Sequence, residues 1–140
     1  MVSLVEFDRL QMGDAAAIEF TVTNAEIRAF RKLSGDTNPI HDDPEYAHTC
    51  GYPRPIVYGA LIVARVSRLL GTRLPGHGCV WQSLSMNFLC PLFVGEAARL
   101  VGTVLHANAD LRIVIIGLSL YAGGRRVAEG RAQALFKGPL

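Results

Sequence analysis

The sequence lacks most features that mark membrane, nucleic-acid-binding and metal-binding proteins. In its 140 residues, no uncharged apolar run approaches the roughly 20 residues that a membrane-spanning helix needs. The formal net charge is only +2, and the arginines, Arg125 among them, are scattered. We therefore expect solvated surface arginines and no nucleic-acid partner. No phosphate-binding or dinucleotide-binding glycine pattern occurs, and His48, His77 and His106 lack metal-ligand spacing, so neither a metal nor a cofactor is expected.

Cysteine is also scarce. The three residues Cys50, Cys79 and Cys90 form no Cys-x-x-Cys pair, and an odd count of this kind favours reduced thiols in a cytoplasmic protein. The first residues carry charges and no apolar stretch, so no signal peptide is expected. Cys79 and Cys90 stand among apolar residues and are expected to be small core residues.

Apolar residues, in contrast, are abundant. Half of the residues are hydrophobic, which excludes a disordered chain, and the length allows a sizeable core. There is no internal repeat, low-complexity tract or linker. We therefore predict a single domain over residues 1–140.

The pattern of apolar residues predicts an α+β fold. A strand over 15–22 precedes a helix that Thr23 and Asn24 begin and Gly35 ends, with Ile27, Phe30 and Leu33 at helical spacing. The longest predicted helix, Ile56–Leu70, is apolar on nearly all sides and should be central. A short helix over 44–50 and strands over 79–93, 97–107, 111–122 and 126–136 complete the prediction. We expect a curved antiparallel sheet around the long helix.

The turn between the first two predicted helices holds the leading candidates for catalysis. Asp36 and His41 place a carboxylate and an imidazole in a short Gly- and Pro-containing turn, an arrangement suited to proton transfer. From spacing alone, it is equally consistent with two residues that only shape a loop. Asn38 is a candidate to orient a bound carbonyl, although Asn before Pro is also an ordinary turn residue.

Two further candidates lie on the long helix. Gly59 stands near its start, where unpaired amides attract negative charge and a missing side chain lets a substrate carbonyl approach. Close packing of helix and sheet would explain the glycine equally well. Ser67 is expected to bond a carbonyl one turn back or to support the turn that carries Asp36.

The motif from Gly35 to His41, Gly-Asp-Thr-Asn-Pro-Ile-His, resembles the hydratase-2 motif of the MaoC-like (R)-specific enoyl-CoA hydratases. The similarity continues, in order and with compatible spacing, through Arg54–Gly59, Leu74–Gly76, Gln82–Leu84 and Pro91–Glu96. It therefore covers most of the chain. The resemblance implies a hotdog fold, in which a curved antiparallel sheet wraps one long helix, and a homodimer with active sites near the subunit interface.

The resemblance also implies an activity and assigns roles. It implies reversible syn hydration of a trans-2-enoyl-CoA to the (R)-3-hydroxyacyl-CoA, with Asp36 and His41 activating the water and the Gly59 amide binding the thioester oxygen. Ser67 matches a serine that supports the site. Which of Asp36 and His41 is the base and which the acid stays open. Tyr58 departs from the family, which often has His there, and is expected to alter pocket shape or acyl preference.

Other functions of the same fold stay open. A dehydratase acting on carrier-protein thioesters would need the same residues, with the pantetheine belonging to the substrate rather than to a cofactor. A thioesterase would direct water at the thioester carbonyl instead of C3. A non-catalytic acyl-thioester-binding subunit is disfavoured because Asp36, Asn38 and His41 are all present.

Overall fold

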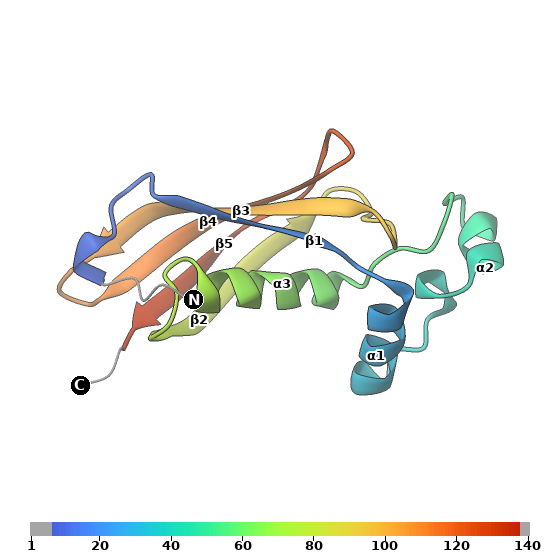
Figure 1. Ribbon diagram of the computed structural model, residues 1–140, viewed down its shortest axis with the longest axis horizontal. Coiled ribbons are helices and arrows are strands. Elements are labelled where there is room, and N and C mark those ends of the chain that lie inside the picture. Colours follow the sequence, from blue (N-terminus) through green and yellow to red (C-terminus); the bar gives the residue numbers. More distant parts are fainter. Residues whose placement is uncertain (1–6, 138–140) are drawn as a thin grey trace.

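The computed structural model describes residues 7–137; residues 1–6, which bear on the expected lack of a signal peptide, lie outside the described part. The chain forms a five-stranded antiparallel sheet and helices that precede most of its strands (Figure 1). The elements are η1 (Phe7–Arg9), β1 (Ala15–Thr21), α1 (Asn24–Ser34), η2 (Pro39–His41), α2 (Pro44–Thr49), α3 (Gly59–Thr72), β2 (Cys79–Phe88), β3 (Ala97–Asn108), β4 (Ile113–Ala122) and β5 (Arg125–Phe136).

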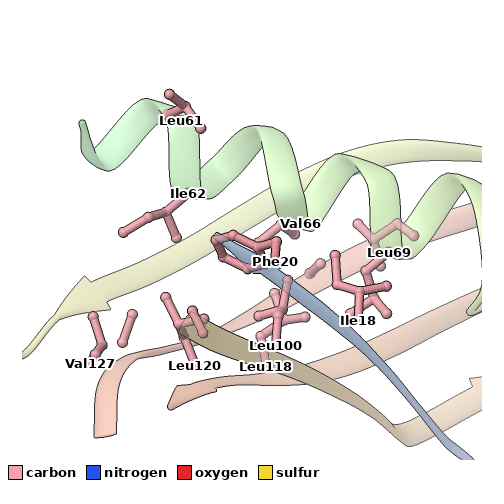
Figure 2. Close-up of a cluster of buried hydrophobic side chains, with 14 of the residues drawn as sticks. Ile18, Phe20, Leu61, Ile62, Val66, Leu69, Leu100, Leu118, Leu120 and Val127 are labelled. Carbon is pink, nitrogen blue, oxygen red and sulfur yellow. The ribbon is translucent and has the colours of Figure 1, made fainter. Parts of the chain in front are cut away.

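The sheet has the order β1-β3-β4-β5-β2, and α3 runs along one of its faces (Figure 1). The side chains of α3 that point to the sheet are buried, and Figure 2 shows them meeting residues of several strands. Burial of each such side chain contributes about 1.5–3 kcal/mol. Close approach also needs Gly102 of β3, because a Cβ atom there would lie 2.9 Å from Leu69 Cδ2. The predicted central helix and curved sheet are therefore confirmed.

The predicted helices and strands are all present, but several of them begin or end at other residues than predicted. α3 begins at Gly59 rather than Ile56 because the preceding residues pair with a distant loop through an Ile56–Phe93 bridge. β2 ends at Phe88, before that loop, rather than at Phe93. Leu33 shares the helical spacing of Ile27 and Phe30, yet its side chain is 84% exposed, because α1 packs only through the face that carries those two residues.

Residues 22–58 form an overhanging segment that carries α1, η2 and α2. It lies beyond the N-terminal end of α3, away from the middle of the sheet (Figure 1). An ion pair between Glu26 of α1 and Arg65 of α3 ties it to the body of the protein. No helix within residues 7–137 is long and apolar enough to cross a membrane.

Candidate active site

The turn that carries Asp36 is built from local hydrogen bonds. Gly35 ends α1 in the left-handed conformation, with φ of 75°, and its amide donates to the Arg31 carbonyl. Asp36 Oδ1 then accepts a hydrogen bond from the Asn38 amide at 3.0 Å, and Asn38 Oδ1 accepts one from the Ile40 amide at 3.2 Å. These successive side-chain caps hold the backbone in one shape. Among the described residues Asp36 Oδ2 has no hydrogen-bond partner, so this oxygen is available to a ligand.

The ring of His41 is oriented by a carbonyl from a different part of the chain. His41 Nδ1 lies 2.6 Å from the Ile56 carbonyl oxygen, and the Ile56 amide donates to the Ile40 carbonyl at 3.1 Å. A carbonyl only accepts hydrogen bonds, so Nδ1 must carry the proton. In its neutral form the ring therefore presents an unprotonated Nε2, which is the nitrogen available to exchange a proton with a ligand.

Tyr58 contacts both candidate catalytic residues. Its ring stacks on the His41 ring with centroids 3.8 Å apart, and its hydroxyl donates to the Asp36 carbonyl at 2.7 Å. The side chain is buried, and Phe30 packs against its ring. Burial raises the pKa of the Tyr58 phenol above its ordinary value, as do the nearby charges of Asp36 and Asp42. Tyr58 is therefore a neutral hydrogen-bond donor that links the two residues, while its expected effect on acyl preference stays a prediction.

Gly59 begins α3 directly after Tyr58. As the first residue of the helix, its amide has no acceptor within the helix and is free to bind an anionic oxygen. The packing explanation also applies, because a Cβ atom at Gly59 would lie 3.1 Å from the Phe88 ring. A groove of about 380 Å³ opens beside it; its lining is apolar apart from Cys90 and consists of Ile56, Val57, Gly59, Ile62, Phe88, Leu89, Cys90, Pro91 and Leu92. The groove is thus lined in part by Ile56, the residue whose carbonyl holds His41.

The other two predicted site residues are less directly placed. The carboxamide oxygen of Asn38 caps η2, which agrees with the interpretation of Asn38 as a turn residue. The NH2 group of the same side chain is left to donate elsewhere. Ser67 lies on the exposed side of α3, and no hydrogen bond of its hydroxyl occurs among the described residues. The bond to a carbonyl one turn back is therefore not formed, and a supporting role for Ser67 stays a prediction.

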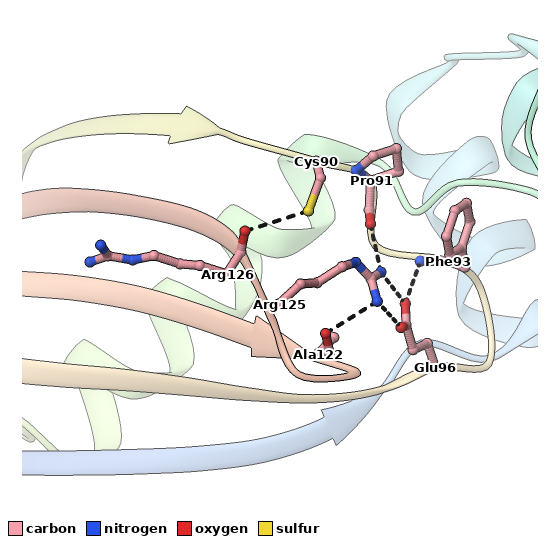
Figure 3. Close-up of polar contacts among 7 residues, drawn as sticks. All are labelled: Cys90, Pro91, Phe93, Glu96, Ala122, Arg125 and Arg126. Atoms are coloured by element: carbon pink, nitrogen blue, oxygen red, sulfur yellow. Dashed lines mark hydrogen bonds and ion pairs between the residues drawn. The ribbon is translucent and has the colours of Figure 1, made fainter.

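An ion pair that the sequence did not predict lies next to Pro91, one of the residues that line the groove. Glu96 and Arg125 form a two-bond pair, with distances of 2.5 and 2.7 Å (Figure 3). The Arg125 hydrogen bond lowers the pKa of Glu96, and the Phe93 amide acts in the same direction against an opposing effect of burial. The expectation of a solvated surface arginine is wrong for Arg125. Its partner lies nearly 30 residues away in the sequence, at a spacing that no local pattern reveals.

A second hollow, of about 700 Å³, lies over the sheet and holds none of the predicted site residues. Its lining alternates along the strands with residues that face α3, so it lies on the opposite side of the sheet. Within residues 7–137, no group of three His, Cys, Asp or Glu side chains gathers as metal ligands would. The geometry thus points to the turn and the groove beside Gly59.

Comparisons with known proteins support the fold that the sequence predicted. Residues 9–115 match the model of the MaoC like domain. The chain is 36% identical to the (R)-specific enoyl-CoA hydratase of Aeromonas caviae over 88% of this chain and 92% of that protein. It is 31% identical to the (R)-specific enoyl-CoA hydratase of Rhodospirillum rubrum, over 92% and 90%. A solved structure of the A. caviae (R)-hydratase superposes with a TM-score of 0.88 at 34% identity, over 91% of this chain and 98% of that one. The expected hotdog fold is confirmed.

The Tyr58 hydroxyl is expected to stabilise the overhanging segment. Tyr58→Phe keeps the ring stack on His41 but removes the hydrogen bond to the Asp36 carbonyl, so we expect a loss of about 1 kcal/mol in unfolding free energy. Urea titration measures it. Tyr46→Phe is the matched control, because Tyr46 is 42% exposed on α2. Equal effects of the two substitutions would contradict the prediction.

The Glu96–Arg125 pair is expected to make stability sensitive to acid. Because the pKa of Glu96 is lower in the folded than in the unfolded chain, folded Glu96 binds fewer protons. The contribution of Glu96 to stability is complete above the ordinary pKa of a glutamate, and it is lost as pH falls through the lower pKa of the folded state. Between pH 6 and pH 3, melting temperatures should therefore fall more in the wild type than in Glu96→Gln. Parallel curves for the two proteins would contradict this expectation.

Proposed function

The chain belongs to the family of MaoC-like domains, and we propose that it adds water to trans-2-enoyl-CoA thioesters to form (R)-3-hydroxyacyl-CoA, reversibly. One observation carries the proposal: the Ile56 carbonyl holds His41 with Nε2 free, while the adjoining turn presents the carboxylate of Asp36. Ile56 and Gly59 both line the apolar groove, where an acyl thioester would bind beside the Gly59 amide. The relatives named (R)-specific enoyl-CoA hydratase support the same reaction.

The proposed reaction begins with a water molecule between the two side chains. Asp36 Oδ2 and His41 Nε2 each accept a hydrogen bond from it, which raises the nucleophilicity of its oxygen. That oxygen bonds to C3 of the enoyl group as one of its O–H bonds breaks, the proton passes to the Asp36–His41 pair, and the C2=C3 π electrons move toward the thioester carbonyl. The two residues act as a coupled pair, and any proton that His41 exchanges passes through Nε2, because Nδ1 is bound to Ile56.

The negative charge formed in this step lies on the thioester oxygen. The Gly59 amide, at the start of a 14-residue helix, is placed to donate a hydrogen bond to that oxygen. Loss of one such donor typically lowers a rate by roughly 10²–10³-fold. The enolate then takes a proton at C2 from the Asp36–His41 pair, on the face to which water was added. The hydroxyl and hydrogen of one water molecule are thereby added to C3 and C2, and no cofactor is consumed.

The proposal includes a homodimer in the cytoplasm, and the edge of the sheet supports the dimer. The outer edge of β2 pairs with no strand of the described chain, and its ten residues contain no charge that would block pairing. Val80 and Phe88 at its two ends are about half exposed. A second copy of this strand would pair antiparallel with the first.

The dimer is tested by sedimentation, which should give twice the 15.2 kDa mass of one chain. A Val80→Lys variant should shift the mass toward that of the monomer, because it places a charge on the pairing edge. A wild-type monomer at micromolar concentration would contradict the dimer.

The catalytic roles are tested by two substitutions. Asp36→Asn and His41→Ala each remove one acceptor for the water, so kcat for hydration of a short trans-2-enoyl-CoA should fall by at least about 10²-fold. Loss of enoyl absorbance measures the rate, and chiral separation of the product identifies the (R) isomer. His48→Ala is the matched control, because His48 lies on α2 and, within residues 7–137, its ring bonds only the nearby Pro53 carbonyl.

The same assay separates the competing functions. Release of free thiol without loss of the enoyl group would indicate a thioesterase and overturn the proposal. Faster turnover of carrier-protein thioesters than of CoA thioesters would identify the carrier-dependent dehydratase. Wild-type rates in both Asp36→Asn and His41→Ala would show that the reaction does not use this pair.

A further inference from the structure

We propose that Glu96 and Arg125, which contact neither Asp36 nor His41, are positioning residues that set the orientation of the His41 ring through the backbone of Ile56. This positioning role belongs to the proposed active site, and only its kinetic test depends on the proposed function. Three successive sets of hydrogen bonds connect the ion pair to the imidazole. Each set joins parts of the chain that are distant in the sequence.

The first set surrounds the Arg125 guanidinium. Besides its two bonds to Glu96, it donates to the Pro91 carbonyl at 2.8 Å and to the Ala122 carbonyl at 3.1 Å (Figure 3). One guanidinium thus joins the loop after β2, the hairpin between β4 and β5, and the residue just before β3. The Glu96 side chain is only 13% exposed, so solvent competes little for these bonds. Two-bond pairs between Arg and a carboxylate fix geometry as well as energy.

The second set passes from Glu96 to Phe93. Glu96 Oε2 accepts a hydrogen bond from the Phe93 amide at 3.0 Å, and the Glu96 amide donates to the Phe93 carbonyl at 3.1 Å. The Phe93 ring lies 5.5 Å from the Arg125 guanidinium and 5.7 Å from that of Arg54. The position of Phe93 therefore depends on the ion pair both through its backbone and through its ring.

The third set passes from the loop between β2 and β3, residues 89–96 and here called the Phe93 loop, to His41. The Val57 amide donates to the Leu92 carbonyl at 2.8 Å, and the Val94 amide donates to the Pro55 carbonyl at 3.0 Å. These bonds flank the bridge between Ile56 and Phe93. In an extended segment, neighbouring residues direct their backbone groups to opposite sides. The Ile56 amide and carbonyl accordingly face away from the loop, toward Ile40 and His41 Nδ1.

The consequence is a short backbone segment, residues 55–57, that lies between the Phe93 loop and the catalytic turn. It has no side chain that anchors it by charge, so its position relative to His41 depends on the loop on its other side. A displacement of about 1 Å at a catalytic group can lower a rate by about 10²-fold. Lysine cannot replace Arg125 fully, because an ammonium group is a point charge without the planar two-bond geometry.

The kinetic test uses Arg125→Lys and Glu96→Gln. We expect each to lower kcat by about 10-fold or more while KM changes less than about threefold, because the groove and the Gly59 amide are retained. Arg126→Lys is the matched control: the Arg126 side chain pairs with Glu129 at 3.1 Å and bonds Ser119 on β4. Its contact with the loop after β2 is a bond from Cys90 Sγ to the Arg126 backbone carbonyl, which the substitution retains. Its kcat should stay within about twofold of the wild type.

A spectroscopic test needs no activity. In histidine-labelled protein, the ¹⁵N signals of the neutral form of wild-type His41 should show a single tautomer with the proton on Nδ1, as the Ile56 bond requires. Arg125→Lys should move these signals toward a mixture of tautomers, whereas Arg126→Lys should leave them unchanged. Because no substrate is present, this result is independent of whether the proposed hydration occurs.

The outcomes separate positioning from simple stabilisation. Lower melting temperatures in Arg125→Lys and Glu96→Gln, with wild-type kcat and wild-type His41 signals, would overturn the inference. If Glu96→Gln does not fold, Arg125→Lys decides alone, because it retains the positive charge. If the wild type lacks hydratase activity but the His41 signals respond to Arg125→Lys, the proposed function fails and the positioning role stands.

Discussion

The hydrogen bond between His41 Nδ1 and the Ile56 carbonyl is the contact on which the arrangement of the site depends. It joins the overhanging segment, which holds the titratable groups, to the strand-like residues that lead into α3. It also settles the tautomer of a neutral imidazole, because a carbonyl accepts only from a protonated nitrogen. One backbone oxygen thereby determines both where the ring lies and which nitrogen is chemically active.

Tyr58 makes this arrangement possible without adding another titrating group. Its ring covers one face of the imidazole, and its hydroxyl holds the backbone of Asp36, so the carboxylate and the imidazole are placed by the same side chain. With the pKa of the phenol raised by burial, Tyr58 stays neutral through the physiological range. The aromatic residue at this position therefore acts as a fixed support between Asp36 and His41.

The start of α3 connects the fold to the chemistry. Tyr58 precedes the helix, Gly59 is its first residue, and the same helix then supplies the buried face against the sheet. Leu69 packs where Gly102 leaves room in β3, and the buried side chains of α3 extend from Leu61, near its start, to Leu70. Buried side chains thus begin within one turn of the Gly59 amide, and a fixed donor suits a group that must bind a developing charge.

The sequence by itself determined the elements, the central helix and the turn that holds Asp36 and His41. Those features depend on neighbours a few residues away: apolar periodicity, the Thr23 cap, the left-handed Gly35 and the side-chain caps of the turn. Only the tertiary structure decided that residues 55–57 are extended, that Leu33 is exposed and that Arg125 is paired. These outcomes depend on contacts between segments tens of residues apart, and local patterns do not record which segments will meet in the folded chain.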